Sequence, residues 1–431
     1  MDLFTKWNQR IRDYSLPASA GQEASVDNQV RQLLARYVDL WWSCDGALPN
    51  FPFTFLPRQQ AENEKRLEQW INGLIVELKR IPADSQERKI WQERLQPALE
   101  EFAITAMNLE ARHLDFIKTT GMVEASQEFA RMARQFDPQI RPEDIYQAGR
   151  NVMTMNFLQL LLDLPVEVTP SVFAYSMLYP YTDNYLDDPA VSRTTKLAFN
   201  NRFQRRLRGE DVRPANNHEA TISRLVEMIE SQWDRVHYPQ VYQSLLAIHE
   251  AQARSMALTV PGASPYELDV LGISFEKGGT SVLADGYLVA GWLNPAQASF
   301  MFGYGAYTQL MDDLEDLEQD MREGCQTVFS QTAGRWPLDR VTNRMIHFGR
   351  AIFGDLSAFP SPSAQLMTEL IYRSIDSVLI DIASRVERYY SKDYRNELER
   401  HVSFRFACTR RQREKLSRQK INLGRLVETL I

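Results

Sequence analysis

The sequence predicts an all-α fold, and three observations support this prediction. Apolar residues recur at helical spacing in several windows, of which the clearest cover residues 30–41, 222–236 and 366–386. Alternation of apolar and polar residues with a period of two, the pattern of a strand, is scarce throughout. Proline, glycine and polar residues break the helical pattern at residues 44–57, 163–170, 209–217 and 259–265. Helices of ordinary length fit between these breaks.

Two of the predicted helices have clear start and stop signals. Thr169 followed by Pro170 is typical of a helix N-terminus, and Pro189 predicts that this helix ends just before it. A later helix is predicted to begin at residues 294–295, where asparagine precedes proline, and to continue to Gly324. Each of these two helices carries a cluster of aspartates near its C-terminal end.

Composition excludes several classes of protein. The 431 residues are 44% apolar and 24% charged, as in an ordinary globular protein, and the net charge of -7 gives no overall attraction to nucleic acid. The N-terminus lacks the apolar run of a signal peptide, and no stretch approaches the ~20 apolar residues that span a bilayer. The three cysteines have no metal-ligand spacing. We therefore expect a cytoplasmic protein without an integral membrane segment or a nucleic-acid partner.

The first acidic cluster comprises Asp183, Asp187 and Asp188. Asp183 and Asp187 are one helical turn apart, so their carboxylates share a helix face and repel each other unless a cation lies between them. Their place near the negative end of the helix dipole is a second unfavourable contribution.

The second acidic cluster comprises Asp312, Asp313, Asp316 and Asp320. Asp312 and Asp316 are one turn apart, as are Asp316 and Asp320. A solvated acidic helix would normally include lysines that relieve this repulsion, but the next cationic residue is Arg322.

Carboxylates without nearby histidines are typical ligands of Mg²⁺, which keeps several waters and binds through a few carboxylates plus substrate phosphates. A di-iron site would require a Glu-x-x-His motif, which neither cluster has. Taken alone, either cluster is equally well explained as a solvated acidic face. The presence of both favours a metal site.

Between the two clusters lies a segment with a lysine, two glycines and two hydroxyl groups, from Lys277 through Thr280 to Ser281. A cation followed by small residues can approach a phosphate closely. The alternative is an ordinary glycine break between two helices.

The order of these three segments resembles that of trans-isoprenyl diphosphate synthases and of the terpene and squalene synthases that share their fold. Asp183-x-x-x-Asp187 is similar to their first aspartate-rich motif, and residues 309–316, preceded by Gly305, are similar to the second. Asp313, Asp316 and Asp320 also have the spacing of the second metal motif in many terpene cyclases. The resemblance covers about residues 120–395, where segments 128–131 and 150–162 are similar to bacterial synthases acting on long prenyl chains.

This resemblance implies a helical bundle around a central cavity, with additional N-terminal helices. We expect an N-terminal helical extension at residues 1–110, a catalytic helical domain at 111–395 and a basic C-terminal helix at 396–431. The basic run that begins at Arg410 is interpreted as a solvated helix face.

The resemblance also implies an activity: a class I terpene synthase that ionises an allylic prenyl diphosphate with Mg²⁺. Its catalytic carboxylates would be Asp183, Asp187, Asp312 and Asp313. The metal ligands would be Asp183, Asp187, Asp188, Asp312, Asp313, Asp316 and Asp320. Contacts to the diphosphate would come from Arg193, Lys277, Gln309, Arg322, Arg388 and Tyr389. An Arg-Tyr pair at this distance contacts diphosphate in many terpene synthases, although Arg388-Tyr389 also fits a helix-end arginine beside a packed tyrosine.

A carbocation requires a dry pocket with aromatic walls. The aromatic candidates are Phe173, Tyr179, Tyr185, Trp292 and Tyr307, each of which is more often a core residue. Tyr179, one turn before Asp183, is the best candidate for limiting the prenyl chain length.

Two other functions stay open. Prenyl transfer, by chain elongation or by squalene-type condensation, would require a second diphosphate site, for which chain-elongating members usually have paired arginines after the first motif. Here only Arg193 follows at that distance. A non-catalytic helical scaffold with acidic surfaces is the other alternative. Assembly as a homodimer is compatible with every one of these functions.

Overall fold

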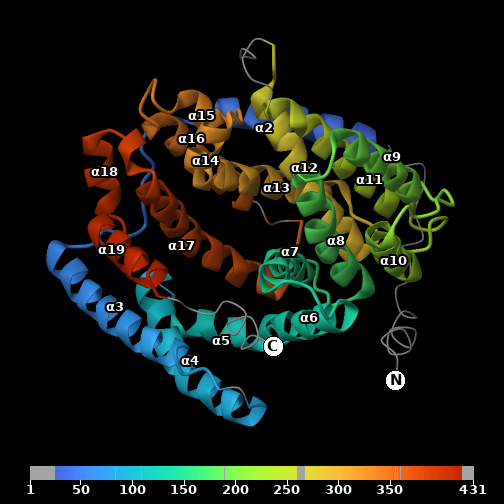
Figure 1. Cartoon of the computed structure of the whole chain (residues 1–431). Helices are drawn as coiled ribbons and strands as arrows, with labels where there is room; N and C mark the ends of the chain where they lie inside the picture. Colours follow the sequence, from blue (N-terminus) through green and yellow to red (C-terminus); the bar gives the residue numbers. More distant parts are fainter. Residues whose placement is uncertain are drawn as a thin grey trace. The chain divides into compact units, whose positions relative to one another are not determined.

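The computed structural model describes residues 25–419, apart from residues 83, 108, 189, 260–266, 355, 357 and 360. Every regular element in these residues is a helix, which confirms the predicted all-α fold class (Figure 1). None of the described helices is both long enough and apolar enough to cross a membrane.

The chain forms two compact units, each assembled from separate stretches of sequence. The described residues of the first unit are 25–36, 121–254 and 276–305. It contains the start of α2 (Val26–Ser43), α6 (Met122–Phe136), α7 (Pro142–Leu161), α8 (Pro170–Asp187), α9 (Arg193–Leu207), α10 (Asn217–Gln232), nearly all of α11 (Pro239–Ser255), most of α12 (Val270–Ala290) and the first half of α13 (Pro295–Glu315).

Helix α8 forms the centre of the first unit, where it packs against α7 and α10. Its first residues are nearly all apolar and are buried on every side, as expected for a helix without a polar face. The predicted N-terminus is confirmed, because the Thr169 hydroxyl accepts a hydrogen bond from the Val172 amide at 3.2 Å and Pro170 is the first helical residue. The helix ends at Asp187, also as predicted.

Helices α12 and α13 approach each other closely within the first unit because both have glycine at the contact. A Cβ atom on Gly305 would lie 2.0 Å from the carbonyl oxygen of Gly278, and one on Gly279 would lie 2.6 Å from the Phe302 ring. The glycines of the 277–281 segment therefore lie inside α12, and the alternative of a glycine break between helices is wrong. Backbone contact between the two helices explains why small residues occur here.

The second unit contains the remaining stretches. These carry the rest of α2, α3 (Pro57–Leu78), α4 (Ser85–Met107), α5 (Ala111–Thr119), η2 (Met256–Thr259), the end of α13, α14 (Leu317–Glu323), α15 (Val328–Thr332), α16 (Asp339–Phe353), α17 (Pro362–Arg385), η3 (Glu387–Tyr389), α18 (Lys392–Glu399) and α19 (Phe406–Ser417). Helix α17 packs against α4, α16, α18 and α19, and α3 packs against α4 and α19.

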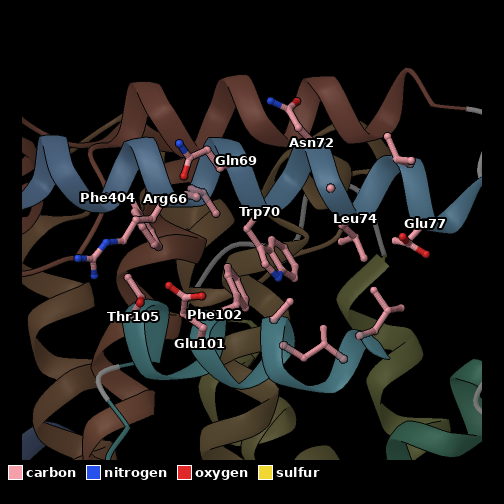
Figure 2. Close-up of a pocket in the computed structure, with 16 residues that line it drawn as sticks. Arg66, Gln69, Trp70, Asn72, Leu74, Glu77, Glu101, Phe102, Thr105 and Phe404 are labelled. Atoms are coloured by element: carbon pink, nitrogen blue, oxygen red, sulfur yellow. The ribbon is translucent and has the colours of Figure 1, made fainter. Parts of the chain in front are cut away.

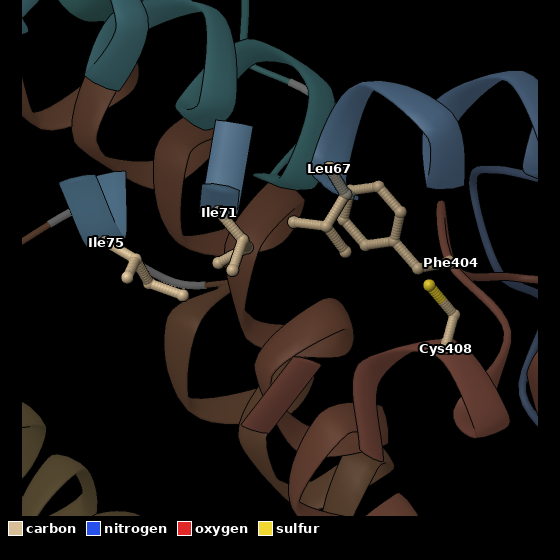
Figure 3. Packing of buried hydrophobic residues seen from close by; sticks show 5 residues of the cluster. All are labelled: Leu67, Ile71, Ile75, Phe404 and Cys408. Carbon is tan, nitrogen blue, oxygen red and sulfur yellow. The ribbon is translucent and has the colours of Figure 1, made fainter. Parts of the chain in front are cut away.

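A small apolar core joins α3 to α19 and to the loop before it. Leu67, Ile71 and Ile75 lie one turn apart on α3 and are buried against Phe404 and Cys408 (Figure 3). Their spacing of four residues places them on one helix face, so that face is covered in this unit.

The breaks predicted at residues 44–57, 163–170 and 209–217 are confirmed, because helices end and begin at each of them. Most of the break at 259–265 lies outside the described residues. The apolar window at 222–236 extends too far, since α10 ends at Gln232 and Val236 is 81% exposed. The division into segments 1–110, 111–395 and 396–431 stays a prediction, and residues 420–431 of the last segment lie outside the described residues.

The helix expected from residue 294 to Gly324 begins as predicted, with the Asn294 side chain accepting from the Gln297 amide at 2.9 Å. It also ends at Gly324, whose φ of 76° is left-handed. Between these ends it is interrupted at Asp316, where α13 gives way to α14. Backbone hydrogen bonds from Asp316 to Asp312 and from Asp320 to Asp316, both 2.9 Å, continue the one-turn spacing across the interruption.

We expect Gly305→Ala to lower the free energy of unfolding by about 1–3 kcal/mol, the usual cost of overpacking, because the added methyl group meets backbone that cannot rotate away. Gly149→Ala, in α7 of the same unit, is the matched control, since no atom lies within 4 Å of a Cβ built there. That variant should gain about 0.5–1 kcal/mol. Urea unfolding measures both, and equal losses in the two variants would contradict the close-contact explanation.

Candidate functional site

The first acidic cluster lies at the end of α8 and borders a cavity of about 70 Å³ in the first unit. Its lining comes from α8, α9 and α11 and is largely apolar or aromatic: Tyr175, Leu178, Tyr179, Thr182, Asp183, Leu186, Asn200, Phe203, Leu207, Leu245, Ile248, His249 and Gln252. Asp183 is the one carboxylate among the described residues that line this cavity. The cavity therefore combines an acidic edge with apolar walls.

Apart from that edge, the cavity lining carries no formal charge at neutral pH. Burial, with a smaller contribution from the charge of Arg208, lowers the pKa of His249 to about 4, so the imidazole is neutral. Burial also raises the pKa of Tyr175 well above its usual value, with smaller contributions from the neighbouring Tyr179 and Asp285. Both side chains therefore present uncharged rings.

Hydrogen bonds to α6 and α7 hold the acidic end of α8 in place. The Tyr181 hydroxyl donates to Asp137 at 2.5 Å, and the Asn184 amide donates to Asp144 at 3.0 Å. Tyr185 stacks on His218 with ring centroids 4.5 Å apart. These contacts orient the helix that positions Asp183.

The other predicted residues of the first cluster lie in and after the last turn of α8. Asp187 is the last residue of the helix, and Asp188 accepts the Ala190 amide at 2.8 Å in the turn that follows. Asp188 thus has a local structural role. Arg193 is the exposed first residue of α9, and its guanidinium makes no ion pair or hydrogen bond with other described residues.

Lys277 is partly buried on α12 of the first unit, and it makes no ion pair within the described part of the chain. The neighbouring Glu276 is bound by Arg254 at 2.6 Å, so this lysine is not needed to neutralise it. Lys277 is therefore available to bind an anion.

The second acidic cluster lies at the end of α13 and in α14, in the second unit. Asp313 is 5% exposed and accepts a hydrogen bond from the Gln309 amide at 2.8 Å. Gln309 therefore orients this aspartate, and its contact with the diphosphate stays a prediction. Asp312 and Asp316 are exposed one turn apart, and Asp320 follows after another turn.

Helix α17 and η3 place arginines beside this second cluster. Arg388 forms an ion pair with Glu318 at 3.0 Å and donates to the Tyr389 hydroxyl at 2.9 Å. Arg385 pairs with Glu315 in the same unit. The predicted Arg388-Tyr389 pair thus lies next to the acidic helix, whereas Arg322 is exposed at the end of α14 and makes no ion pair among the residues that the structure describes.

Each unit therefore brings together part of the predicted site. Asp183, Asp187, Asp188, Arg193 and Lys277 belong to the first unit; Gln309, Asp312, Asp313, Asp316, Asp320, Arg322, Arg388 and Tyr389 belong to the second. Of the aromatic candidates, Tyr179 lines the cavity. Phe173 and Tyr307 are fully buried against other aromatic rings, as core residues are.

Among the described side chains, no three histidines, cysteines or acidic residues are grouped so that they could hold a metal ion by themselves. Magnesium does not require such a group, because it is usually bound by one or two carboxylates together with waters and substrate phosphates. Asp183 in one unit and the Asp312-Asp316 pair in the other are donors of this kind. The residues present fit Mg²⁺ bound together with a phosphorylated substrate.

No model of a known protein family matches the chain, and no curated protein matches it.

Sequence reasoning missed a buried acid in the first unit, Asp285 on α12. Its Oδ1 atom accepts from the Asn151 amide at 3.0 Å, and its Oδ2 atom has no hydrogen-bond partner among the described residues. The same Asn151 amide also lies 3.2 Å from the Ser176 hydroxyl. Burial raises the pKa of Asp285 well above its usual value. An isolated aspartate within the apolar run at 282–290 was the available signal.

We expect Asp285→Asn to stabilise the protein increasingly as pH rises. In the unfolded chain an aspartate loses its proton near pH ~4, whereas burial raises the pKa of Asp285 in the folded protein. The wild type therefore loses up to about 1.4 kcal/mol of stability per pH unit between the unfolded and the folded pKa. Asparagine keeps the acceptor for Asn151 and cannot ionise.

Urea unfolding at several pH values between about 4 and 8 measures this difference. Asp39→Asn, at an exposed position of α2, is the control and should show no such trend. A constant difference between Asp285→Asn and the wild type at every pH would contradict a retained proton on Asp285.

Proposed function

We propose that this protein is a class I terpene synthase, which uses Mg²⁺ to ionise an allylic prenyl diphosphate and converts the resulting cation to a terpene. The observation that carries the proposal is the surroundings of Asp183. This carboxylate lies at the edge of an apolar, aromatic cavity whose other polar groups are uncharged. Ionisation of a prenyl diphosphate requires carboxylates for the metal ions beside a cavity with apolar and aromatic walls.

The second acidic cluster supports the same chemistry. Asp313 is buried and held by Gln309, so its carboxylate is oriented before any ligand binds. The exposed Asp312 and Asp316 offer further oxygen donors at one-turn spacing. Arg388 lies next to this cluster through its ion pair with Glu318.

Bound Mg²⁺ would neutralise the negative charge of the leaving diphosphate. Arginine and lysine side chains near the acidic clusters would also pair with the negative charge of the diphosphate. Arg193 and Lys277 in the first unit are not engaged by described acidic residues, so they can pair with phosphate oxygens without breaking an existing ion pair. Arg388 would exchange Glu318, an exposed partner, for the diphosphate, which costs little because exposed ion pairs are weak.

The cavity walls act on the cation that remains. Tyr175, Tyr179 and Phe203 present aromatic rings, which stabilise positive charge through their faces. Tyr179 is held in one orientation by its 2.6 Å hydrogen bond with Ser281 of α12. Its position one turn from Asp183 agrees with a role in limiting chain length, because the tail would pass this ring.

The experiment is incubation with Mg²⁺ and single prenyl diphosphates of increasing length, without isopentenyl diphosphate, while diphosphate release and extractable products are measured. We expect Asp183→Asn to lower the turnover by about 100-fold or more, because it removes a charge that acts on the leaving group. Asp313→Asn tests separately whether the acidic cluster of the second unit is needed. Asp39→Asn, exposed on α2, is the matched control and should retain full turnover.

Unfolding curves establish that each variant is folded before its turnover is compared. Product formation that is independent of Mg²⁺, or unchanged in both aspartate variants, would contradict the proposal. Turnover that appears only after isopentenyl diphosphate is added would indicate chain elongation. A chain that is inactive under all these conditions would be better described as a helical scaffold.

A further inference from the structure

An apolar groove of about 600 Å³ runs between α3 and α4 in the second unit (Figure 2). Trp70 of α3 and Phe102 of α4 stack in it with ring centroids 4.2 Å apart. Its volume lies in the range of about 300–1,000 Å³ that is typical of ligand sites. The groove belongs to neither acidic cluster and has no part in the proposed reaction.

Apolar side chains on both helices are left exposed along this groove. Val76 of α3 is 46% exposed, and Leu99 of α4 is 47% exposed. Leu74 and Leu95 also line it. Exposed apolar side chains along a groove between two helices can be covered by the apolar face of another helix.

Helix α19 lies along α3 and ends near one end of the groove. Arg405, just before α19, pairs with Glu64 at 2.6 Å, and Lys415, near the end of α19, donates to Asn72. The two helices therefore run in the same direction. The described chain ends at Gln419, four residues after Lys415. Both helices rise by about 1.5 Å per residue, so Gln419 lies beside the residue four positions after Asn72, which is Val76.

Twelve residues follow Gln419 in the sequence, and six of them are apolar. Leu423, Leu426, Val427 and Leu430 have the i, i+3, i+4, i+7 spacing of one helix face. The segment must turn back to follow the groove from the level of Val76, which would take about three residues. The eight residues from Leu423 to Leu430 would then be about 12 Å long as a helix, enough to reach from the level of Val76 past that of Trp70 (Figure 2).

One charge of the groove can pair with this segment. Lys420 and Arg425 of the segment are basic. In the groove, Glu77 is already paired with Arg94 at 2.6 Å, whereas Glu101 makes no ion pair with other described residues. Such pairs at a groove rim set orientation more than affinity.

We propose that residues 420–431 dock in the groove between α3 and α4 of the same chain, with their apolar face against Trp70, Leu74, Val76 and Leu99. Recognition is of the helix-in-groove kind, in which side chains at i, i+3, i+4 and i+7 enter an apolar channel. The segment is tethered through α19, so its effective concentration at the groove is high and a weak intrinsic affinity is enough to keep it bound.

The test uses the full chain carrying Leu426→Asp and Leu430→Asp, which prevents the segment from docking, and a fluorescent peptide with the sequence of residues 420–431. We expect the doubly substituted protein to bind this peptide saturably. The wild-type protein should bind it at least about tenfold more weakly, because its own segment competes. Hydrogen exchange in residues 66–77 should also be faster in the doubly substituted protein.

Further substitutions in the doubly substituted protein locate the binding. Val76→Asp or Leu99→Asp should abolish peptide binding. Ile90→Asp is the matched control, because Ile90 is 65% exposed on α4 but does not line the groove. That substitution should leave peptide binding unchanged.

Equal peptide binding by the wild-type and doubly substituted proteins would overturn the proposal, as would no binding by either. A loss of binding in Ile90→Asp as large as that in Leu99→Asp would also overturn it. Concentration-dependent dimers of the wild-type protein that are abolished by Val76→Asp would overturn it as well, and would assign the groove to a second copy of the chain.

Discussion

The contact between α12 and α13 is the constraint on which the interior of the first unit depends. Two helices approach closely only where side chains are absent, and Gly279 and Gly305 provide this. Because the glycine face of α12 packs against α13, two polar side chains of α12 point toward α7 and α8. Ser281 then reaches Tyr179 on α8, and Asp285 reaches Asn151 on α7. One steric requirement therefore determines the position of the groups behind the cavity.

Charge is distributed unevenly between the interior and the helix ends. Asp285 and His249 are ionisable groups whose burial favours their neutral forms, so the cavity region of the first unit stays apolar despite them. The acidic clusters lie near helix ends, with Asp183 one turn before the end of α8 and the Asp312 to Asp320 series at the end of α13 and in α14. The proposed ionisation chemistry would use this separation, because metal ions would bind at the polar edge while the cation would be kept from water.

In the second unit, packing and ion pairs reinforce each other along α3. The buried face of α3 meets Phe404 and Cys408, and the hydrogen bonds from Arg405 lower the pKa of Glu64 at one end of that contact. The groove between α3 and α4 is next to this core, because Leu67 and Phe404 line both and Trp70 and Phe102 pack against the core. The apolar surface of α3 therefore continues from the buried core into the groove.

The sequence alone determined the helical class, most helix boundaries and both acidic clusters, because these depend on local physics. Caps at Thr169 and Asn294, the glycine at 324 and the one-turn spacing of aspartates act within a few residues along the chain. Tertiary structure decided what depends on neighbours from distant segments. The glycines at 278 and 279 lie inside a helix that packs against α13, and Gln309 donates a hydrogen bond to Asp313. Tyr179, and not Phe173, lines the cavity. Asp285 is buried beside Asn151. No local pattern carries this information, because burial and side-chain pairing arise only when separate helices pack together.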